Sequence, residues 1–126
     1  MKDREQAPST SAAERLAMLE LKLPTVTPPV VPGYTPAFVP FRRSGSQIHV
    51  SGRLAKREGQ VLVGKVGAEI SLPEAREAAR GIALELVSVL REAAGDLEKV
   101  RLVKLFAMIN GAPDFLDPHK VADGAS

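Results

Sequence analysis

The segment Val100–Ile109, "VRLVKLFAMI", constrains the fold more than any other part of the chain. In a strand, alternate side chains point to opposite faces, and here both faces are apolar. One face carries Val103, Leu105, Ala107 and Ile109, and the other Val100, Leu102, Phe106 and Met108. Such a strand must be covered on both faces. The chain has one strong amphipathic helix, which can cover one face, so we expect a second subunit on the other.

That helix is predicted between Ser71 and Gly95. Ser71 and Glu74 have the spacing of a capping box, Pro73 suits a first turn, and Gly95 is a typical stop. Apolar residues follow at helical spacing: Ala75, Ala79, Ile82, Ala83, Leu86, Leu90 and Ala93. Charged residues occupy most of the opposite face. The pattern predicts a long helix lying across a small sheet.

Strands are predicted before this helix. Phe38–Arg43 and Gln47–Arg53 flank the turn Ser44–Ser46, and Lys56–Gln60 is a second turn signal before an apolar Val61–Val63. Together with the helix they indicate a mixed α and β chain, in which one long helix crosses a small sheet.

The N-terminal part of the chain lacks the strand pattern of the segments that follow it. Residues 1–11 are polar and predicted to be disordered, and Ser11 with Glu14 predicts a short capped helix from Ala12 to about Leu21. The proline-rich stretch that follows, "LPTVTPPVVPGYTP", favours an extended arm. Its valines need cover, so we expect it to lie across its own sheet; a ligand for another domain is the alternative. We therefore divide the chain into a tail with a short helix, 1–22, and one domain, 23–126.

Composition excludes several functions. The chain of 126 residues has no cysteine, which removes disulfides, thiolate catalysis and cysteine-ligated metals. His49 and His119 are far apart in sequence, and Asp114 and Asp117 near His119 suit a proline-flanked turn, so we predict neither a metal nor another cofactor. No segment resembles a signal peptide or a membrane span, and we interpret the protein as cytoplasmic. A net charge of +2 and 4% aromatic residues disfavour a nucleic-acid surface.

His49 and Ser51 raise the question of a nucleophile with its base. Two residues apart on one strand face, they are separated by roughly 6.5–7 Å at the backbone, whereas a base must lie within about 3 Å of its nucleophile. We interpret them as a polar strand face. Gly52 leaves room for a ligand or another backbone, so Ser51 and nearby amides could hold a small anion. Equally, Gly52 could be a β-bulge and Ser51 a satisfied hydroxyl.

The order of these features resembles the RidA (YjgF) family, in particular its longer bacterial branch. The resemblance covers Leu23 to Ser126 and rests on Tyr34 with Pro36, "VSGRLA", "GKVG", the helix ending in "AAGDLEKV", the strand "RLVKLFAMIN" and the final "PDF…GAS". It implies a chorismate-mutase-like α/β (α+β) fold, a sheet with helices packed on one face, whose C-terminal elements are expected to be missing here. It also implies a homotrimer with ligand sites between subunits, and hydrolysis of reactive imines or enamines to 2-oxo acids and ammonia. Other members are described as endoribonucleases, and some lack deaminase activity.

Carried over by position, the resemblance implies a substrate-binding set of Tyr34, Ser51, Gly52, Arg53 and Asp123. Arg53 stands where glutamine is common, which adds a charge, and Asp123 stands where asparagine is common in "NGAS", which removes an amide donor. The family's carboxylate-binding arginine and water-associated glutamate belong to a last helix and strand, expected beyond Ser126. We expect the chain to be a fragment; a truncated coding sequence or a short natural variant are the alternatives.

Three functions follow as hypotheses. The first is a RidA-like deaminase acting on 2-iminobutanoate and 2-iminopropanoate, with its site incomplete in this chain and its catalytic residues unknown. The second is a non-catalytic trimeric module that binds small carboxylates or a partner enzyme. The third is an endoribonuclease, ranked last because no acid–base pair or stacking platform is evident.

Overall fold

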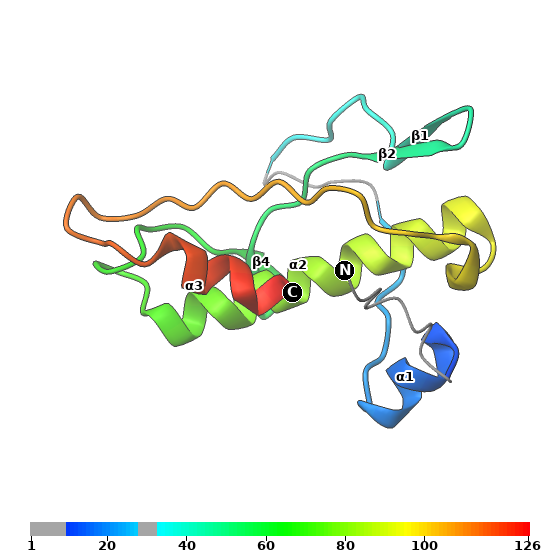
Figure 1. Cartoon of the computed structure of the whole chain (residues 1–126). Helices are drawn as coiled ribbons and strands as arrows, with labels where there is room; N and C mark the ends of the chain where they lie inside the picture. Colours follow the sequence, from blue (N-terminus) through cyan, green and yellow to red (C-terminus); the bar gives the residue numbers. More distant parts are fainter. Residues whose placement is uncertain (1–9, 28–32) are drawn as a thin grey trace, which may run out of the picture.

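The computed structural model describes residues 10–27 and 33–126 (Figure 1). The predicted disorder of residues 1–9 and the cover of Val30 and Val31 lie outside these ranges. The elements are, in chain order, α1 (Ala12–Met18), β1 (Phe41–Ser44), β2 (Gln47–Val50), β3 (Lys56–Arg57), β4 (Gln60–Val61), α2 (Leu72–Ala94), η1 (Leu97–Lys99), α3 (Pro118–Ala122) and η2 (Asp123–Ala125).

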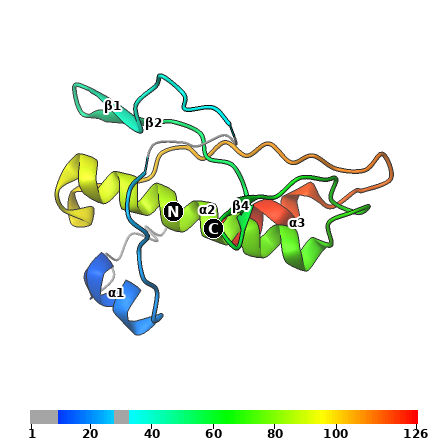
Figure 2. The same cartoon turned by 180° about the vertical axis from the view of Figure 1, so that it is seen from behind.

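Helix α2 is the longest element. The two hairpins, α3 and the two 3-10 helices lie along it, whereas α1 is set apart (Figures 1 and 2). Its start is the predicted capping box: the Glu74 amide donates to Ser71 Oγ at 3.3 Å, and the Ser71 amide donates to Glu74 Oε2 at 2.8 Å. It ends at Gly95, whose φ of 79° suits glycine and whose amide donates to the Arg91 carbonyl at 2.8 Å. Both predicted boundaries are confirmed.

Both predicted hairpins form. In β1–β2, Ser44 pairs with Gln47 across a turn at Gly45, and in β3–β4, Arg57 pairs with Gln60. The second turn places Glu58 and Gly59 at φ 51° and 78°, the arrangement of a type I′ turn. The strands are shorter than predicted and make two separate two-stranded antiparallel sheets. The mixed α/β class is confirmed, with small sheets and helices as its parts.

Helix α1 starts as predicted and ends early. Both hydrogen bonds of the Ser11–Glu14 capping box are present. The helix stops at Met18 rather than Leu21, because Glu20 adopts a φ of 54°. None of its residues is buried, so no packing extends it.

The core lies at the N-terminal end of α2. Val66, Ile70, Ala75 and Val121 are all buried, with Leu62, Leu72, Ala79, Ile109 and Phe115 packed against them. Element η2 closes on α2 at Gly124, where an added Cβ would lie 2.3 Å from the Arg76 carbonyl oxygen. Only glycine permits that approach.

The arm does not lie across a sheet in the part described, which corrects the prediction. The buried hydroxyl of Ser88 on α2 donates to the Pro24 carbonyl at 2.8 Å, and Leu23 to Val26 border the C-terminal half of the helix. Farther along, the Thr27 carbonyl accepts from Arg53 at 2.7 Å. The Ser88 hydroxyl, which α2 places among apolar side chains, therefore holds the arm against the helix.

The segment Val100–Ile109 is extended, but it forms no strand with the residues that the structure describes. Backbone pairing begins only beyond it, where Val66 donates to the Asn110 carbonyl and accepts from the Ala112 amide, each at 2.9 Å. Val103 is 90% exposed and Met108 87%, so both faces are open in the single chain. The prediction of a sheet strand covered on one face by the helix is therefore wrong for the single chain, because residues 10–27 and 33–126 place no strand beside this segment.

Candidate ligand-binding site

Ser51 directly follows β2, and both of its hydrogen-bond donors bind backbone carbonyl groups. Its amide donates to the Pro40 carbonyl at 2.9 Å, and its hydroxyl donates to the Val39 carbonyl at 2.6 Å. His49 is exposed on β2, opposite Arg42 on β1. The Ser51 proton is thus held by a carbonyl rather than an imidazole, in agreement with the interpretation of a polar strand face. The hydroxyl oxygen keeps its lone pairs as acceptors.

Gly52 borders open space. An added Cβ at this position would meet nothing within 4 Å. The ladder of β2 ends at Val50, so Gly52 is not a bulge inside that strand. A ligand could reach the backbone here without displacing any part of the described chain.

Arg53 is the most unusual polar side chain of the region. Its Nη1 donates to the Thr27 carbonyl, whereas Nε and Nη2 are buried and have no partner among residues 10–27 and 33–126. Each buried donor without an acceptor costs about 1–3 kcal/mol. Nε and Nη2 form one edge of the planar guanidinium, the edge that binds both oxygens of a carboxylate. This geometry suits an anion with two parallel oxygens.

Neither Tyr34 nor Asp123 forms a hydrogen bond with Arg53 among the described residues. Tyr34 is 64% exposed on the segment that leads to β1. Asp123 begins η2, which packs on the N-terminal half of α2, and the extended segment 100–109 passes between η2 and β2 in both views (Figures 1 and 2). The structure therefore groups Ser51, Gly52 and Arg53 as neighbours in the chain, and it links neither Tyr34 nor Asp123 to Arg53 by a hydrogen bond.

The C-terminal loop takes a structural role. Asp117 precedes α3, and its Oδ2 lies 3.4 Å from Lys120 Nζ, an ion pair within the helix that contains His119. Among the described residues, no group of three or more acidic or histidine side chains could hold a metal ion. Likewise, no helix in the described ranges is long and apolar enough to cross a membrane.

Sequence reasoning missed the contacts that hold the arm. Ser88 is buried at 1% exposure in the apolar stretch of α2, and Thr27 supplies the carbonyl that orients Arg53. A serine among valines and leucines on a helix was an available signal for Ser88, because a buried hydroxyl needs a partner. No signal identified Thr27, since its contact uses a backbone carbonyl that every residue has.

Comparison with known proteins gives the chain a family. No family model matches it. Protein TCP17 of Trypanosoma cruzi is 39% identical over 120 residues, which cover 94% of this chain and 72% of that protein. The chain belongs to the same family as TCP17.

Two solved structures resemble it. A protein of Shewanella oneidensis described as a "putative endoribonuclease" has a TM-score of 0.73 and 26% identity, covering 92% of this chain and 75% of its own. Protein Atu1372 of Agrobacterium tumefaciens, of unknown function, has a TM-score of 0.58 and 33% identity, covering 74% and 62%. These neighbours are compatible with the RidA-like fold.

Proposed function

We propose that this chain is a RidA-like imine deaminase domain in which Arg53 binds the substrate carboxylate. The observation that carries the proposal is the edge of Arg53: two buried nitrogens without a partner among the described residues, beside the open backbone of Gly52. The substrates are 2-iminobutanoate and 2-iminopropanoate. Water adds to the imine carbon, the carbon–nitrogen bond breaks, and the products are the 2-oxo acid and ammonia.

Each nearby residue has a role in this proposal. Arg53 grips the carboxylate by two parallel hydrogen bonds, which fixes the direction of the imine carbon. Gly52 admits the substrate to the backbone, and the Ser51 oxygen accepts from the imine N–H while its own proton stays on the Val39 carbonyl.

The assembly we propose is a cytoplasmic homotrimer with sites between subunits. Several large apolar side chains of segment 100–109 are exposed: Val103 is 90%, Met108 87% and Phe106 75% exposed. Apolar surface of this kind is typical of an interface between subunits. In this proposal a neighbouring subunit covers it and brings its Tyr34 or Asp123 to Arg53.

The test uses the full gene product and imines generated enzymatically from amino acids. We expect release of 2-oxo acid and ammonia faster than spontaneous hydrolysis. Arg53→Lys keeps the positive charge but removes the two parallel N–H donors of the guanidinium. We therefore expect kcat/KM to fall about tenfold or more, mainly because KM rises. Arg42→Lys, on the neighbouring strand, is the control and should leave kcat/KM unchanged. If the wild-type protein does not accelerate imine hydrolysis, the proposed deaminase activity is refuted.

A non-catalytic module that binds small carboxylates is the second candidate. It is favoured by the Ser51 hydroxyl, whose proton is already engaged, so that the described chain places no free general acid beside Arg53. Calorimetric binding of 2-oxobutanoate that Arg53→Lys weakens, without any turnover, would establish this candidate. Absence of carboxylate binding would eliminate both.

An endoribonuclease is the third candidate, suggested by the description of the Shewanella protein. RNA cleavage that survives successive purification steps and responds to a variant of this chain would support it. RNA cleavage that disappears on purification would eliminate the endoribonuclease candidate.

A further inference from the structure

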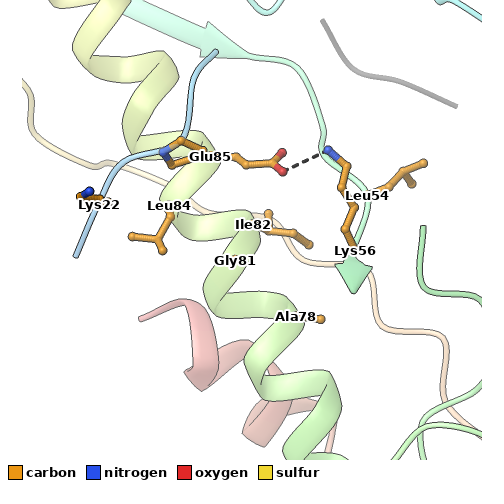
Figure 3. A pocket seen from close by; sticks show the side chains of 9 residues that line it. Lys22, Leu54, Lys56, Ala78, Gly81, Ile82, Leu84 and Glu85 are labelled. Carbon is orange, nitrogen blue, oxygen red and sulfur yellow. Dashed lines mark hydrogen bonds and ion pairs between the residues drawn. The ribbon is translucent and has the colours of Figure 1, made fainter. Parts of the chain in front are cut away.

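A groove crosses the middle of α2, away from Arg53. It has a volume of about 240 Å³ and lies between the arm, the strand entering β3 and the helix (Figure 3). Its apolar surface comes from Pro24, Leu54, Ala78, Ile82 and Leu84. Ser51, Gly52 and Arg53 do not line it.

Gly81 lies on the helical side of this groove and has no packing reason to be glycine. A glycine inside a helix costs about 0.5–1 kcal/mol relative to alanine. Its φ is not positive, and an added Cβ would meet nothing within 4 Å. A side chain would fit the fold and would fill the groove. The glycine therefore keeps the groove open at the expense of helix stability.

The polar groups of the groove are one acid and two bases. Glu85 Oε1 lies 3.1 Å from Lys56 Nζ, and the two side chains face each other across the groove in Figure 3. Glu85 Oε2 is buried and has no partner in the described part of the chain, so it would accept one more donor. Lys22 stands on the arm side and adds a second positive charge. A ligand that matched these groups would carry one cationic donor and one anion.

We propose that this groove binds a small zwitterion, an aliphatic amino acid. The ammonium donates to Glu85 Oε2, the carboxylate lies between the two lysines, and the aliphatic side chain covers Gly81 against Ile82 and Leu54. The groove is large enough to admit a small aliphatic amino acid. This site is independent of the proposed deaminase.

Calorimetry with three matched probes tests the charge pattern. L-Norvaline carries both charges, pentanoate only the carboxylate and butylamine only the ammonium. We expect norvaline to bind at least tenfold more tightly than either of the others. Equal binding of pentanoate and norvaline, or no binding of norvaline at millimolar concentration, would overturn the proposal.

Variants test the location. Glu85→Gln should weaken norvaline binding about tenfold, whereas Glu77→Gln, the same change on an exposed part of α2, should not. Gly81→Leu should abolish binding and Gly81→Ala should weaken it, with thermal midpoints no lower than wild type because the space is open. Norvaline binding lost in Arg53→Lys and kept in Glu85→Gln would place the ligand at Arg53 and refute the groove.

Discussion

The core at the N-terminal end of α2 and the extended segment 100–109 both contain large apolar residues, but most of those in the segment are exposed, whereas those of the core are buried. Val66, Ile70 and Val121 are 5–6% exposed, whereas Val103 is 90% and Phe106 75% exposed. Hydrophobicity alone therefore does not decide which residues a single protomer buries. The difference shows which apolar surface the chain covers by itself and which it leaves exposed.

The reason lies in the backbone. At the N-terminal end of α2, Val66 is bridged to both Ile70 and Gly111, and Gly124 lets η2 approach the Arg76 carbonyl closely. These contacts satisfy main-chain groups while they bring side chains together. The segment 100–109 has the side chains of a core strand and lacks a neighbouring strand within the described chain.

The largest effect should come from creating a cavity in the core at the N-terminal end of α2. Ile70→Ala removes most of a side chain that is 5% exposed, so the free energy of unfolding should fall by about 2–5 kcal/mol. Urea denaturation measures it. Val103→Ala is the matched change in the exposed segment and should alter protomer stability by less than about 0.5 kcal/mol. Similar losses in both variants would mean that the two regions do not differ as described.

Assembly should depend on the exposed segment. Phe106→Asp puts a charge on its apolar surface, so subunit association should weaken by about 2 kcal/mol or more, roughly thirtyfold in the dissociation constant. Sedimentation over a concentration series measures the change, and Lys104→Asp controls for added negative charge. A wild type that stays monomeric at high concentration would contradict the proposed trimer.

The two capping boxes give a smaller contrast. Ser71→Ala removes the cap of α2 and should lower global stability by about 1 kcal/mol. Ser11→Ala removes the same motif from α1, which has no buried residue, and should only fray that helix. Hydrogen exchange distinguishes the two, because the first change should raise exchange throughout α2. A global loss from Ser11→Ala would show that α1 is integral to the core.

The smallest effect is the response to acid. The Ser71 amide, the Ser71 hydroxyl and Arg57 lower the pKa of Glu74, and the Lys65 amide lowers the pKa of Glu69. A lowered folded pKa gives stability that is present above the ordinary value of 4.5 and is lost as the pH falls through the folded value. Both acids lie at the N-terminal end of α2, and segment 100–109 has none. Thermal midpoints should decline below about pH 4.5 and decline less in Glu74→Gln; an identical decline in the variant would refute the role of Glu74.

The candidate site was only partly predictable. Ser51, Gly52 and Arg53 are neighbours in sequence, so strand geometry was enough to place them together and to dismiss a Ser51–His49 pair. The partnerless edge of Arg53 was not predictable, because it depends on where the arm brings the Thr27 carbonyl. The groove at Gly81 was missed for the same reason: three segments distant in sequence enclose it.

By itself, the sequence determined the local elements: both capping boxes, the stop at Gly95, and the hairpin turns at Gly45 and Gly59. Each depends on side-chain to backbone contacts or on a backbone angle within a few residues, so the residue types are sufficient. Tertiary structure alone decided that the arm follows α2, that Val100–Ile109 joins no strand of the described chain, and that Arg53 keeps two donors free among the described residues. Those outcomes depend on which distant backbone groups meet, and no short stretch of residues specifies that.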